Sequence, residues 1–364
     1  MGRNWRWDPC ISHSGPEVET FIGEYFSTAS KNAILVAGAG FDPRSCVIAT
    51  RLSAAGTKLR GIFFQEIRPN PSVELVRRAA ENLELLVKLV PDSVVVPVEI
   101  FETDGAVVGG RNVVKELSRQ SLEGVTDIIV DISALSVGTS FPAIRYLVEL
   151  IDSGKTTANL HLFVTHNPDL DSRITSVASD SPGYVHGFRG ELTLDASAKA
   201  AKLWLPQLAM GRQQALSRVR GFVDPQDTCP ILPFSGRDPR LGDVLAQEYL
   251  VEFESGWQVD ARDIVYADEE DPLDLYRTIL RLDDLRRPVF AEVGGSVLIL
   301  SPLGSKVMAV GALMAALERD LPVAYLESIS YDLIAVEDSS TDLHLIHIWL
   351  EGDGYPKPRP RLQS

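Results

Sequence analysis

The stretch KNAILVAGAGFDPRS, Lys31 to Ser45, joins an apolar run to two glycines and an Asp-Pro-Arg turn. The apolar run Ala33 to Ala37 predicts a buried strand, and the composition of Cys46 to Ala55 is typical of a helix. A strand, a glycine turn and a helix in this order direct backbone N–H groups and a helix N-terminus toward one point in space. We therefore expect this stretch to open an α/β domain.

Strands and helices alternate in the residues that follow. Further apolar strands are predicted at residues 59–66, 93–101, 126–132 and 159–165, helical periodicity at residues 73–89 and 112–118, and a helix that ends near residue 152. Strands that are apolar throughout are typical of a parallel sheet with helices on both faces. The sequence therefore predicts an α/β, Rossmann-like domain over residues 1–165.

The same alternation returns in the second half of the chain. Strands are predicted at residues 230–234, 263–268, 296–300 and 322–326, and helices at residues 241–253, 272–283 and 307–318. Residues 343–350 alternate between apolar and polar, as an edge or antiparallel strand does. We expect a second Rossmann-like domain over residues 228–352, a connector with some structure over residues 166–227, and a disordered tail over residues 353–364.

The opening stretch has a partial repeat in the second half. In CPILPFSGRDPRLGDVLAQEY, Cys229 to Tyr249, the triplet Asp238-Pro239-Arg240 follows an apolar run, as Asp42-Pro43-Arg44 does. A loop with serine and glycine also follows a late strand in both halves, at residues 133–139 and 301–306. These similarities between the two halves predict an internal duplication that produced two tandem domains with mainly parallel sheets.

Ligands of a doubly wound sheet bind in the crevice at the carboxyl ends of its first and fourth strands. The Asp-Pro-Arg loop follows the predicted first strand of each half, and the serine- and glycine-containing loop follows a late strand. Each domain is therefore expected to hold one small-anion pocket, with no catalytic residue and no metal ligand. The candidate ligand-binding residues are Gly38, Gly40, Asp42, Arg44, Glu66, Asp131, Ser133, Ser136, Gly138 and Thr139 in the first domain, and Asp238, Arg240, Asp268, Gly304, Ser305 and Lys306 in the second.

Arg44 and Arg240 each have two possible roles. The guanidinium fork of either residue can pair with a ligand phosphate or carboxylate, or it can form a buried bridge, to Asp131 or to Asp243. Asp42 suits a helix N-cap that is followed by proline. The sequence leaves both roles of the two arginines open.

The remaining candidates also divide between ligand contact and structure. Glu66 and Asp268 end predicted strands, where an acid can accept hydrogen bonds from ribose hydroxyls or simply face water. The dinucleotide fingerprint is broken, because proline stands at position 43 where its third glycine would fall, so Gly38 and Gly40 fit a tight turn as well as a ligand contact. Lys306 opens a predicted helix, where it can meet a ligand phosphate or remain solvated. It is the strongest single candidate for a phosphate contact.

Charge and cysteine content limit the classes of partner. The formal net charge of −15 and the sequence pI of about 4.9 argue against bulk nucleic-acid binding and against anionic membranes. The three cysteines show no CxxC spacing, so neither a disulfide framework nor a zinc site is expected. No apolar run reaches transmembrane length and the first residues are not a secretory signal, so a cytoplasmic location is expected.

Residues Ser301 to Glu327, SPLGSKVMAVGALMAALERDLPVAYLE, resemble the last part of a CARF domain, the Rossmann-like sensor of CRISPR ancillary proteins. The shared features are a strand, a Gly-Thr-Lys-like turn at Gly304-Ser305-Lys306, a small-residue helix and a strand with Val323-Ala324-Tyr325. The family's threonine–glycine approach is replaced here by Ser301-Pro302-Leu303. The resemblance implies a nucleotide sensor that binds cyclic oligoadenylates at a homodimer interface and signals to a protein partner in prokaryotic antiviral defence.

Gly38 to Arg44, GAGFDPR, is similar to the first motif of one branch of SAM-dependent methyltransferases, whose turn reads Gly-Ala-Gly-Phe-Asp-Thr-Arg. Pro43 replaces the threonine of that motif. This resemblance implies SAM as cofactor, with Glu66 as the acid after the next strand.

Three functions follow from these observations. The favoured one is a nucleotide- or small-anion-sensing protein with two Rossmann-like domains and no cofactor, because it uses both copies of the repeat. The second is a SAM-dependent methyltransferase, and the third is a non-catalytic assembly subunit. Binding is favoured over catalysis, because no nucleophile elbow, Walker lysine or HExxH motif is present.

Overall fold

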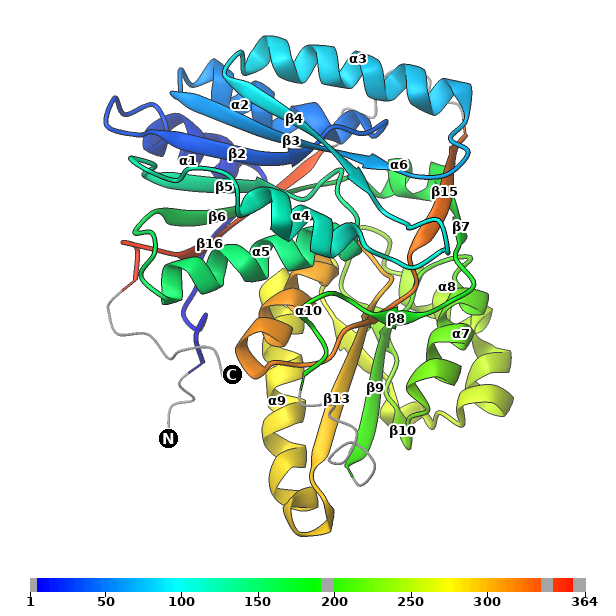
Figure 1. Cartoon of the computed structure of the whole chain (residues 1–364). Coiled ribbons are helices and arrows are strands. Elements are labelled where there is room, and N and C mark those ends of the chain that lie inside the picture. Colours follow the sequence, from blue (N-terminus) through cyan, green and yellow to red (C-terminus); the bar gives the residue numbers. More distant parts are fainter. Residues whose placement is uncertain (1–4, 191–199, 335–342, 356–364) are drawn as a thin grey trace. The chain divides into compact units, whose positions relative to one another are not determined.

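The computed structural model of the chain describes residues 5–190, 200–334 and 343–355 (Figure 1). These residues fold into two compact units. The first unit contains the described residues up to Val177 and those from Ser328 onward, and the second contains those between Ala178 and Glu327. Each unit is described by itself below.

A seven-stranded sheet forms the centre of the first unit. Its strands, in spatial order, are β1 (Ile11–Ser14), β16 (His344–Glu351), β6 (Asn159–His166), β5 (Asp127–Asp131), β2 (Ala33–Gly38), β3 (Leu59–Ile67) and β4 (Ser93–Glu99). From β6 to β4 all neighbouring strands are parallel, whereas β16 runs antiparallel to both β6 and β1. The predicted mainly parallel α/β fold is confirmed.

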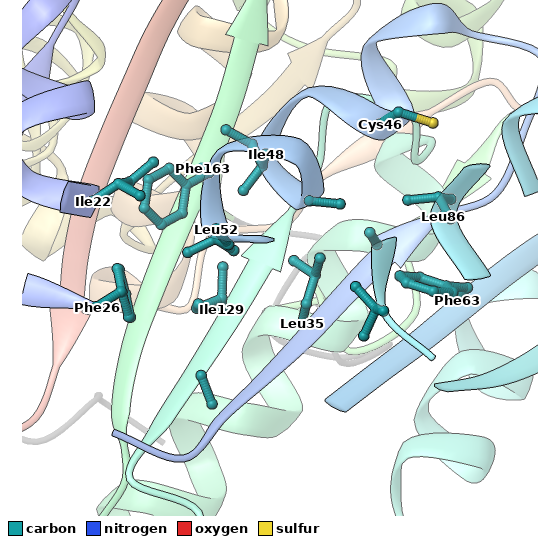
Figure 2. Packing of buried hydrophobic residues seen from close by; sticks show 14 of the residues in the cluster. Ile22, Phe26, Leu35, Cys46, Ile48, Leu52, Phe63, Leu86, Ile129 and Phe163 are labelled. Atoms are coloured by element: carbon teal, nitrogen blue, oxygen red, sulfur yellow. The ribbon is translucent and has the colours of Figure 1, made fainter. Parts of the chain in front are cut away.

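Helices cover both faces of this sheet (Figure 1). One face carries α1 (Pro16–Tyr25), α2 (Val47–Ala54) and α3 (Val73–Leu89), and the other carries α4 (Gly109–Leu117) and α5 (Val137–Asp152). Figure 2 shows the core under the first three helices, where Ile22, Ile48 and Leu86 meet strand residues such as Leu35 and Ile129. Each strand contributes alternate residues to the two faces, which is why the buried strands read as continuous apolar runs.

Three further short elements belong to the first unit. Helix α6 (Pro168–Arg173) follows β6, and β15 (Ser328–Leu333) pairs with β7 (Ile174–Ala178). Because Asn167 caps α6 by accepting a hydrogen bond from the backbone N–H of Leu170 at 3.0 Å, the chain turns away from the sheet directly after β6.

The second unit has its own parallel sheet around β9 (Ala201–Gln207). On one side β9 pairs with β13 (Ser296–Pro302), and on the other with β10 (Asp227–Thr228) and β11 (Ile231–Pro233). Strand β12 (Val265–Ala267) lies beyond β11. On the outer side of β13 a parallel bridge joins Leu300 to Val323, and β14 (Ala324–Tyr325) pairs antiparallel with β8 (Gly183–Tyr184).

Four helices flank this sheet. A buried cluster joins Trp204 and Ile299 of the sheet to α7 (Gln213–Val223) and α8 (Leu241–Glu248). Helices α9 (Pro272–Phe290) and α10 (Lys306–Arg319) pack against each other and against β13. The two helices approach so closely that a Cβ on Gly311 would lie 2.3 Å from the carbonyl oxygen of Pro272. Only glycine fits this crossing.

Both units place their parallel strands in the same order. With β10 and β11, which both pair with β9 on the same side, counted as one interrupted strand, the first parallel strand lies in the middle, the second and third lie on one side, and the fourth lies on the other: β2, β3, β4 and β5 in the first unit, and β9, β10–β11, β12 and β13 in the second. An internal duplication would produce the same strand order in both units. The duplication itself stays a prediction.

The division of the chain differs from the predicted domains in two places. Strand β9 opens the second sheet, although it lies in the predicted connector, residues 166–227. Strand β16 belongs to the sheet of the first unit, although residues 228–352 were expected to form one domain. The chain returns to its first sheet because β16 pairs with the edge of β6 and then pairs with β1 on its other side.

Several predicted boundaries also shift. Helix α9 continues past residue 283 to Phe290, and α8 ends at Glu248 before a separate turn at Glu252–Trp257. The alternation in β16 does not mark an exposed face, because the polar residues of the strand are buried or partly buried. In the predicted tail, the Tyr355 hydroxyl accepts a hydrogen bond from the backbone N–H of Ile11 at 3.0 Å, and residues 356–364 lie outside the described residues.

Candidate functional site

The predicted crevice of the first unit brings its two loops into direct contact. Strand β2 ends at Gly38 and β5 ends at Asp131, and these strands are neighbours in the sheet. A Cβ on Gly38 would lie 2.6 Å from the carbonyl oxygen of Ala134, so the loop after β5 packs on the end of β2. The glycine is therefore needed for close packing of two loops, a role different from the tight turn and the ligand contact that the sequence suggested.

Glu66 occupies the start of helix α5. Its Oε1 accepts a hydrogen bond from the backbone N–H of Ser136 at 2.9 Å and another from the Thr139 hydroxyl at 2.6 Å. Its Oε2 accepts from the Arg68 guanidinium at 2.7 Å. Burial opposes the charged form of Glu66, but the Arg68 charge and these hydrogen bonds outweigh it and hold the pKa of the carboxyl below its ordinary value. The protein's own carboxylate thus fills the position where a helix N-terminus would bind an anion.

Arg44 is buried and paired with two carboxylates. Its Nε and Nη2 donate to Asp42 at 3.0 and 2.7 Å, and its Nη1 lies 2.8 Å from Asp171 on α6. Burial opposes the charge of Arg44, but Asp42 and Asp171 raise its pKa above the ordinary value. The buried bridge considered from the sequence therefore exists, with Asp42 and Asp171 as its acids in place of Asp131.

Neighbouring polar residues complete this loop structure. Asp42 also accepts from the backbone N–H of Arg44 at 2.9 Å, and the Asn82 side chain donates to the carbonyl oxygens of Gly40 and Asp42 at 2.9 and 3.1 Å. Asn82 was not predicted, because it lies on α3 among charged residues and only the fold brings it to the glycine loop. These contacts fix the backbone after β2.

The loop after β5 is held in the same way. Asp131 accepts from the backbone N–H of Ser133 at 2.9 Å and from its hydroxyl, and the Ser133 hydroxyl accepts from the backbone N–H of Thr165 at 2.8 Å. The Ser136 and Thr139 hydroxyls lie 3.2 Å apart, and Gly138 is buried in the first turn of α5. The predicted residues of the first unit therefore lie at or after the ends of β2, β3 and β5, and their polar side chains are bonded to groups of the protein itself.

The second unit presents a different arrangement at the equivalent crevice, between the ends of β9 and β13. Gly304 follows β13, and a Cβ on it would lie 3.2 Å from the Gln207 Cβ and 3.4 Å from the carbonyl oxygen of Leu208. Ser305 caps α10 by accepting from the backbone N–H of Met308 at 3.3 Å, and Lys306 is the first residue of this 14-residue helix. The predicted triplet Gly304-Ser305-Lys306 thus lies at the switch point of the sheet.

Gln207 supplies a buried polar atom at this point. The residue is only 1% exposed, and its Nε2 donates to the carbonyl oxygen of Met308 at 3.2 Å. Its Oε1 has no hydrogen-bond partner among the described residues and would lie 3.4 Å from a Cβ on Gly304. A buried acceptor without a partner is costly, so an approaching donor would be bound favourably there. Sequence reasoning missed Gln207, because β9 was assigned to the connector.

The second Asp-Pro-Arg triplet is not equivalent to the first. It follows β11, which is the second strand of its sheet, whereas the first triplet follows β2, the first strand of its sheet. Asp238 accepts from the backbone N–H of Arg240 at 2.9 Å, and both residues are exposed. The correspondence drawn from the sequence fails because β9 was not recognised as the first strand.

Asp268 organises the loop after β12. Its Oδ1 accepts from the backbone N–H groups of Glu270 and Asp271 at 2.8 and 3.2 Å, and its Oδ2 accepts from the Ser235 hydroxyl at 2.9 Å. Asp271 in turn caps α9 by accepting from the backbone N–H of Leu273 at 2.9 Å. The acidic run is therefore a set of turn and cap residues.

Two features that would suggest other functions are not found in residues 5–190, 200–334 and 343–355. These residues contain no group of three or more His, Cys, Asp or Glu side chains placed to hold a metal ion. Nor does this part of the chain contain a helix that is both long and apolar enough to span a membrane.

Comparisons with known proteins give only weak similarities. No family model matches the chain, and no curated protein matches it. The chain is similar to a universal stress protein from Archaeoglobus fulgidus DSM 4304, with 11% identity and a TM-score of 0.23, over 82% of this chain and 97% of that one. It is also similar to an alpha,alpha-trehalose-phosphate synthase (UDP-forming) from Burkholderia xenovorans in complex with glucose-6-phosphate, with 14% identity and a TM-score of 0.26, over 84% of this chain and 64% of that one. Neither similarity carries an argument about function.

Proposed function

We propose that this protein binds a small anionic ligand of the nucleotide class at the start of α10, and that it acts as a sensor. The observation that carries the proposal is the Gln207 Oε1 atom, which is buried beside Gly304 and has no hydrogen-bond partner among the described residues. It lies where the first and fourth strands of the sheet separate, which is the general position of ligands in open α/β sheets.

The proposed site offers two kinds of recognition. The first backbone N–H groups of α10 and the ammonium group of Lys306 favour a phosphate. The Gln207 Oε1 atom favours a hydroxyl or amino group that donates a hydrogen bond. A nucleotide carries both groups within one molecule, whereas inorganic phosphate carries only the first. The proposal therefore favours a nucleotide over a simple anion.

The first unit is not included in the proposed ligand site. Glu66 already binds the N–H group at the start of α5, and Arg44 has carboxylate partners on Asp42 and Asp171. Both carboxylate oxygens of Glu66 accept hydrogen bonds within the protein, so ribose hydroxyls would have to compete with them. This arrangement gives no support to a methyltransferase, whose SAM site would use Glu66.

The wider role extends the same proposal. A sensor of this kind would act in the cytoplasm, within a prokaryotic antiviral defence system, through a second copy of the chain or through another protein. The resemblance of residues 301–327 to CARF domains supports this role, and cyclic oligoadenylates are the corresponding ligands to test.

Thermal-shift measurements with AMP, ATP, cyclic tetra-adenylate and SAM test the proposal. We expect at least one of the three adenine nucleotides to raise the melting temperature, and Lys306→Ala to remove that rise. Lys88→Ala, an exposed lysine on α3, is the matched control and should leave the rise unchanged. Stabilisation by SAM alone would favour the methyltransferase, and no stabilisation by any of the four compounds would favour an assembly subunit.

A further inference from the structure

Three histidines and one aspartate form a continuous chain across four neighbouring strands of the first unit. Asp127 is on β5, His161 on β6, His347 on β16 and His13 on β1. The His161 Nε2 lies 3.2 Å from the Asp127 Oδ1, and the His161 Nδ1 lies 3.0 Å from the His347 Nε2. The His347 Nδ1 lies 2.9 Å from the His13 Nδ1. We refer to these four residues as the histidine chain.

When all three imidazoles are neutral, one placement of the ring protons gives each of the three contacts a donor and an acceptor. Because a carboxylate only accepts, His161 must donate through Nε2 and therefore accepts at Nδ1. His347 must then donate through Nε2 and accept at Nδ1, so His13 donates through Nδ1. Every hydrogen bond of the chain is made without an extra proton, and only the outer nitrogen of His13 is left as an acceptor.

Aromatic rings surround the middle of the histidine chain. The Phe21 ring of α1 is stacked on His347 with centroids 4.2 Å apart and on His13 at 4.5 Å, and the Phe163 ring lies 4.6 Å from His347. His161 and His347 are fully buried, whereas His13 is partly exposed. Water therefore reaches the histidine chain at His13.

The charged and titratable groups around the histidine chain lie near its two ends. At the inner end, Asp127 accepts from the Tyr25 hydroxyl at 2.8 Å and lies 3.4 Å from the Lys31 ammonium group. At the outer end, Glu17 of α1 acts electrostatically on His13. At the inner end, burial and Asp127 raise the pKa of the Tyr25 hydroxyl, and the charge of Asp353 adds to this effect. Lys31 balances the charge of Asp127, so the neutral histidine chain adds no net charge to this part of the unit.

Burial lowers the pKa of all three imidazoles. For His347 the pKa falls well below its ordinary value, first by burial and then by the two neighbouring histidines. For His161 burial outweighs the opposite effect of Asp127, and for His13 it outweighs that of Glu17. Burial opposes the charged form of Asp127, but hydrogen bonds from His161, Thr126 and Tyr25 hold its pKa below the usual range. The folded unit therefore favours neutral imidazoles beside a charged carboxylate.

We propose that the histidine chain is an acid-sensitive lock that holds β1 and β16 on the sheet at neutral pH and releases β1 when the pH falls. A proton on His347 would place a charge between Phe21 and Phe163, away from any carboxylate of the chain. If instead each imidazole passed a proton inward and Asp127 took the last one, Lys31 would lose its counter-charge. Both outcomes cost free energy, whereas separation of β1 exposes the histidines to water.

The sign of the pH effect follows from proton linkage. Each imidazole has a lower pKa in the closed chain than its unfolded value of about 6.5, so the opened state binds more protons below that pH. The stabilisation by the chain is therefore complete above about pH 6.5 and is lost as the pH falls. Strand β1 is the element expected to open first, because it has four residues and, among the described strands, pairs with β16 alone.

Hydrogen–deuterium exchange of the full chain tests the lock, with rates corrected for the intrinsic pH dependence of exchange. We expect the equilibrium constant for opening of β1 to increase as the pH falls below about 6.5. The increase should be about tenfold per pH unit for each proton that opening takes up, while the amides of β9 in the second unit stay protected. His13→Gln and His347→Gln should each reduce this pH dependence, because an amide does not titrate. His344→Gln is the matched control on the same strand, since His344 bonds Ser14 and lies outside the chain.

The wild-type measurement tests whether the lock exists, and the variants test whether the histidine chain forms it. Unchanged protection of β1 between pH 7.5 and about pH 4.5, more than a unit below the unfolded pKa values, would overturn the proposal. Should His347→Gln fail to fold, His13→Gln still assigns the effect, because His13 is partly exposed. A loss of pH dependence in His344→Gln equal to that in His13→Gln would also overturn it.

Discussion

Ser136 donates its backbone N–H to the Glu66 carboxylate at 2.9 Å, so the start of α5 is bound by an anion that the protein itself supplies. The equivalent position in the second unit, at the start of α10, has Gly304 and Ser305 beside the buried Gln207. The described contacts at the two positions thus differ: a carboxylate from another strand binds the start of α5, whereas the start of α10 carries its own Ser305 cap beside the buried Gln207 Oε1 atom. This difference is the basis for placing the ligand in the second unit.

Replacement of Glu66 should both destabilise the first unit and create an anion site. Glu66→Ala removes the buried carboxylate that accepts from the Arg68 guanidinium, the Thr139 hydroxyl and the Ser136 N–H, and we expect a loss of about 2–4 kcal/mol in the free energy of unfolding. Inorganic phosphate should restore part of this loss, since it can bind the exposed N–H groups. Urea denaturation with and without phosphate measures both effects.

Glu116→Ala is the control for this change, because Glu116 on α4 forms an ion pair with the exposed Arg119, which follows the helix. A loss below about 1 kcal/mol is expected for it, as for other surface pairs. A phosphate effect of equal size in both variants would contradict the account of Glu66 as an internal anion.

Arg44 should be required for stability whether or not a ligand is present. Arg44→Ala leaves Asp42 and the partly exposed Asp171 without their common partner, and we expect a loss of about 3–5 kcal/mol. Arg51→Ala is the matched control, because Arg51 pairs with Glu19 at the surface and should cost less than about 1 kcal/mol. Equal midpoints of urea denaturation for the two variants would refute the assignment of Arg44 as a buried structural residue.

Two glycines in the helices of the second unit should respond in opposite directions to alanine. Gly311→Ala would force a Cβ to within 2.3 Å of the Pro272 carbonyl oxygen, so we expect a loss of about 1–3 kcal/mol. Gly221 lies on α7 with nothing within 4 Å of a Cβ, so Gly221→Ala should stabilise by about 0.5–1 kcal/mol. Thermal denaturation gives the melting temperature of each variant. Melting temperatures that shift in the same direction for both variants would contradict the packing of α9 on α10.

Cys229 should be unreactive in the folded protein at neutral pH. Burial raises the pKa of its thiol to about 11, with a further contribution from Asp263. Alkylation requires the thiolate, so iodoacetamide at pH 8 should label Cys229 roughly a hundredfold more slowly in the folded than in the urea-unfolded chain. Peptide mass spectrometry measures the two rates, and equal rates would show that the thiol is not buried as described.

The sequence predicted much of the fold, because apolar strands and helical periodicity are local patterns. The strand at residues 33–37, the switch-point loop at Gly304 and the helix after it all appear where the pattern placed them. Strand β9 was assigned to the connector and not to the second sheet, since its neighbours in that sheet come later in the chain. That omission shifted the second copy by one strand and misaligned the Asp-Pro-Arg triplets.

Contacts between distant residues were beyond the reach of local patterns. The hydrogen bond between Glu66 on β3 and Ser136 at the start of α5 joins residues 70 positions apart that only the folded sheet brings together. The histidine chain needs four strands in one order, including a return of β16 to the first sheet. In the sequence, the odd spacing of His344 and His347 places them on opposite faces of a strand, and nothing there indicates that His347 contacts His161 and His13. Composition thus indicated which residues form strands. The contacts between distant residues depend on the order of the strands in the sheet, which composition does not give.

The central claim is that a nucleotide binds at the start of α10. Isothermal titration of ATP and of cyclic tetra-adenylate into wild type, Lys306→Ala, Gln207→Met and the control Lys88→Ala tests it most directly. We predict saturable binding of at least one nucleotide to wild type and Lys88→Ala, with affinity reduced at least about tenfold in the other two variants, as expected for the loss of one charged or buried hydrogen bond. Binding of equal affinity in all four proteins, or of neither nucleotide to wild type, would contradict the claim.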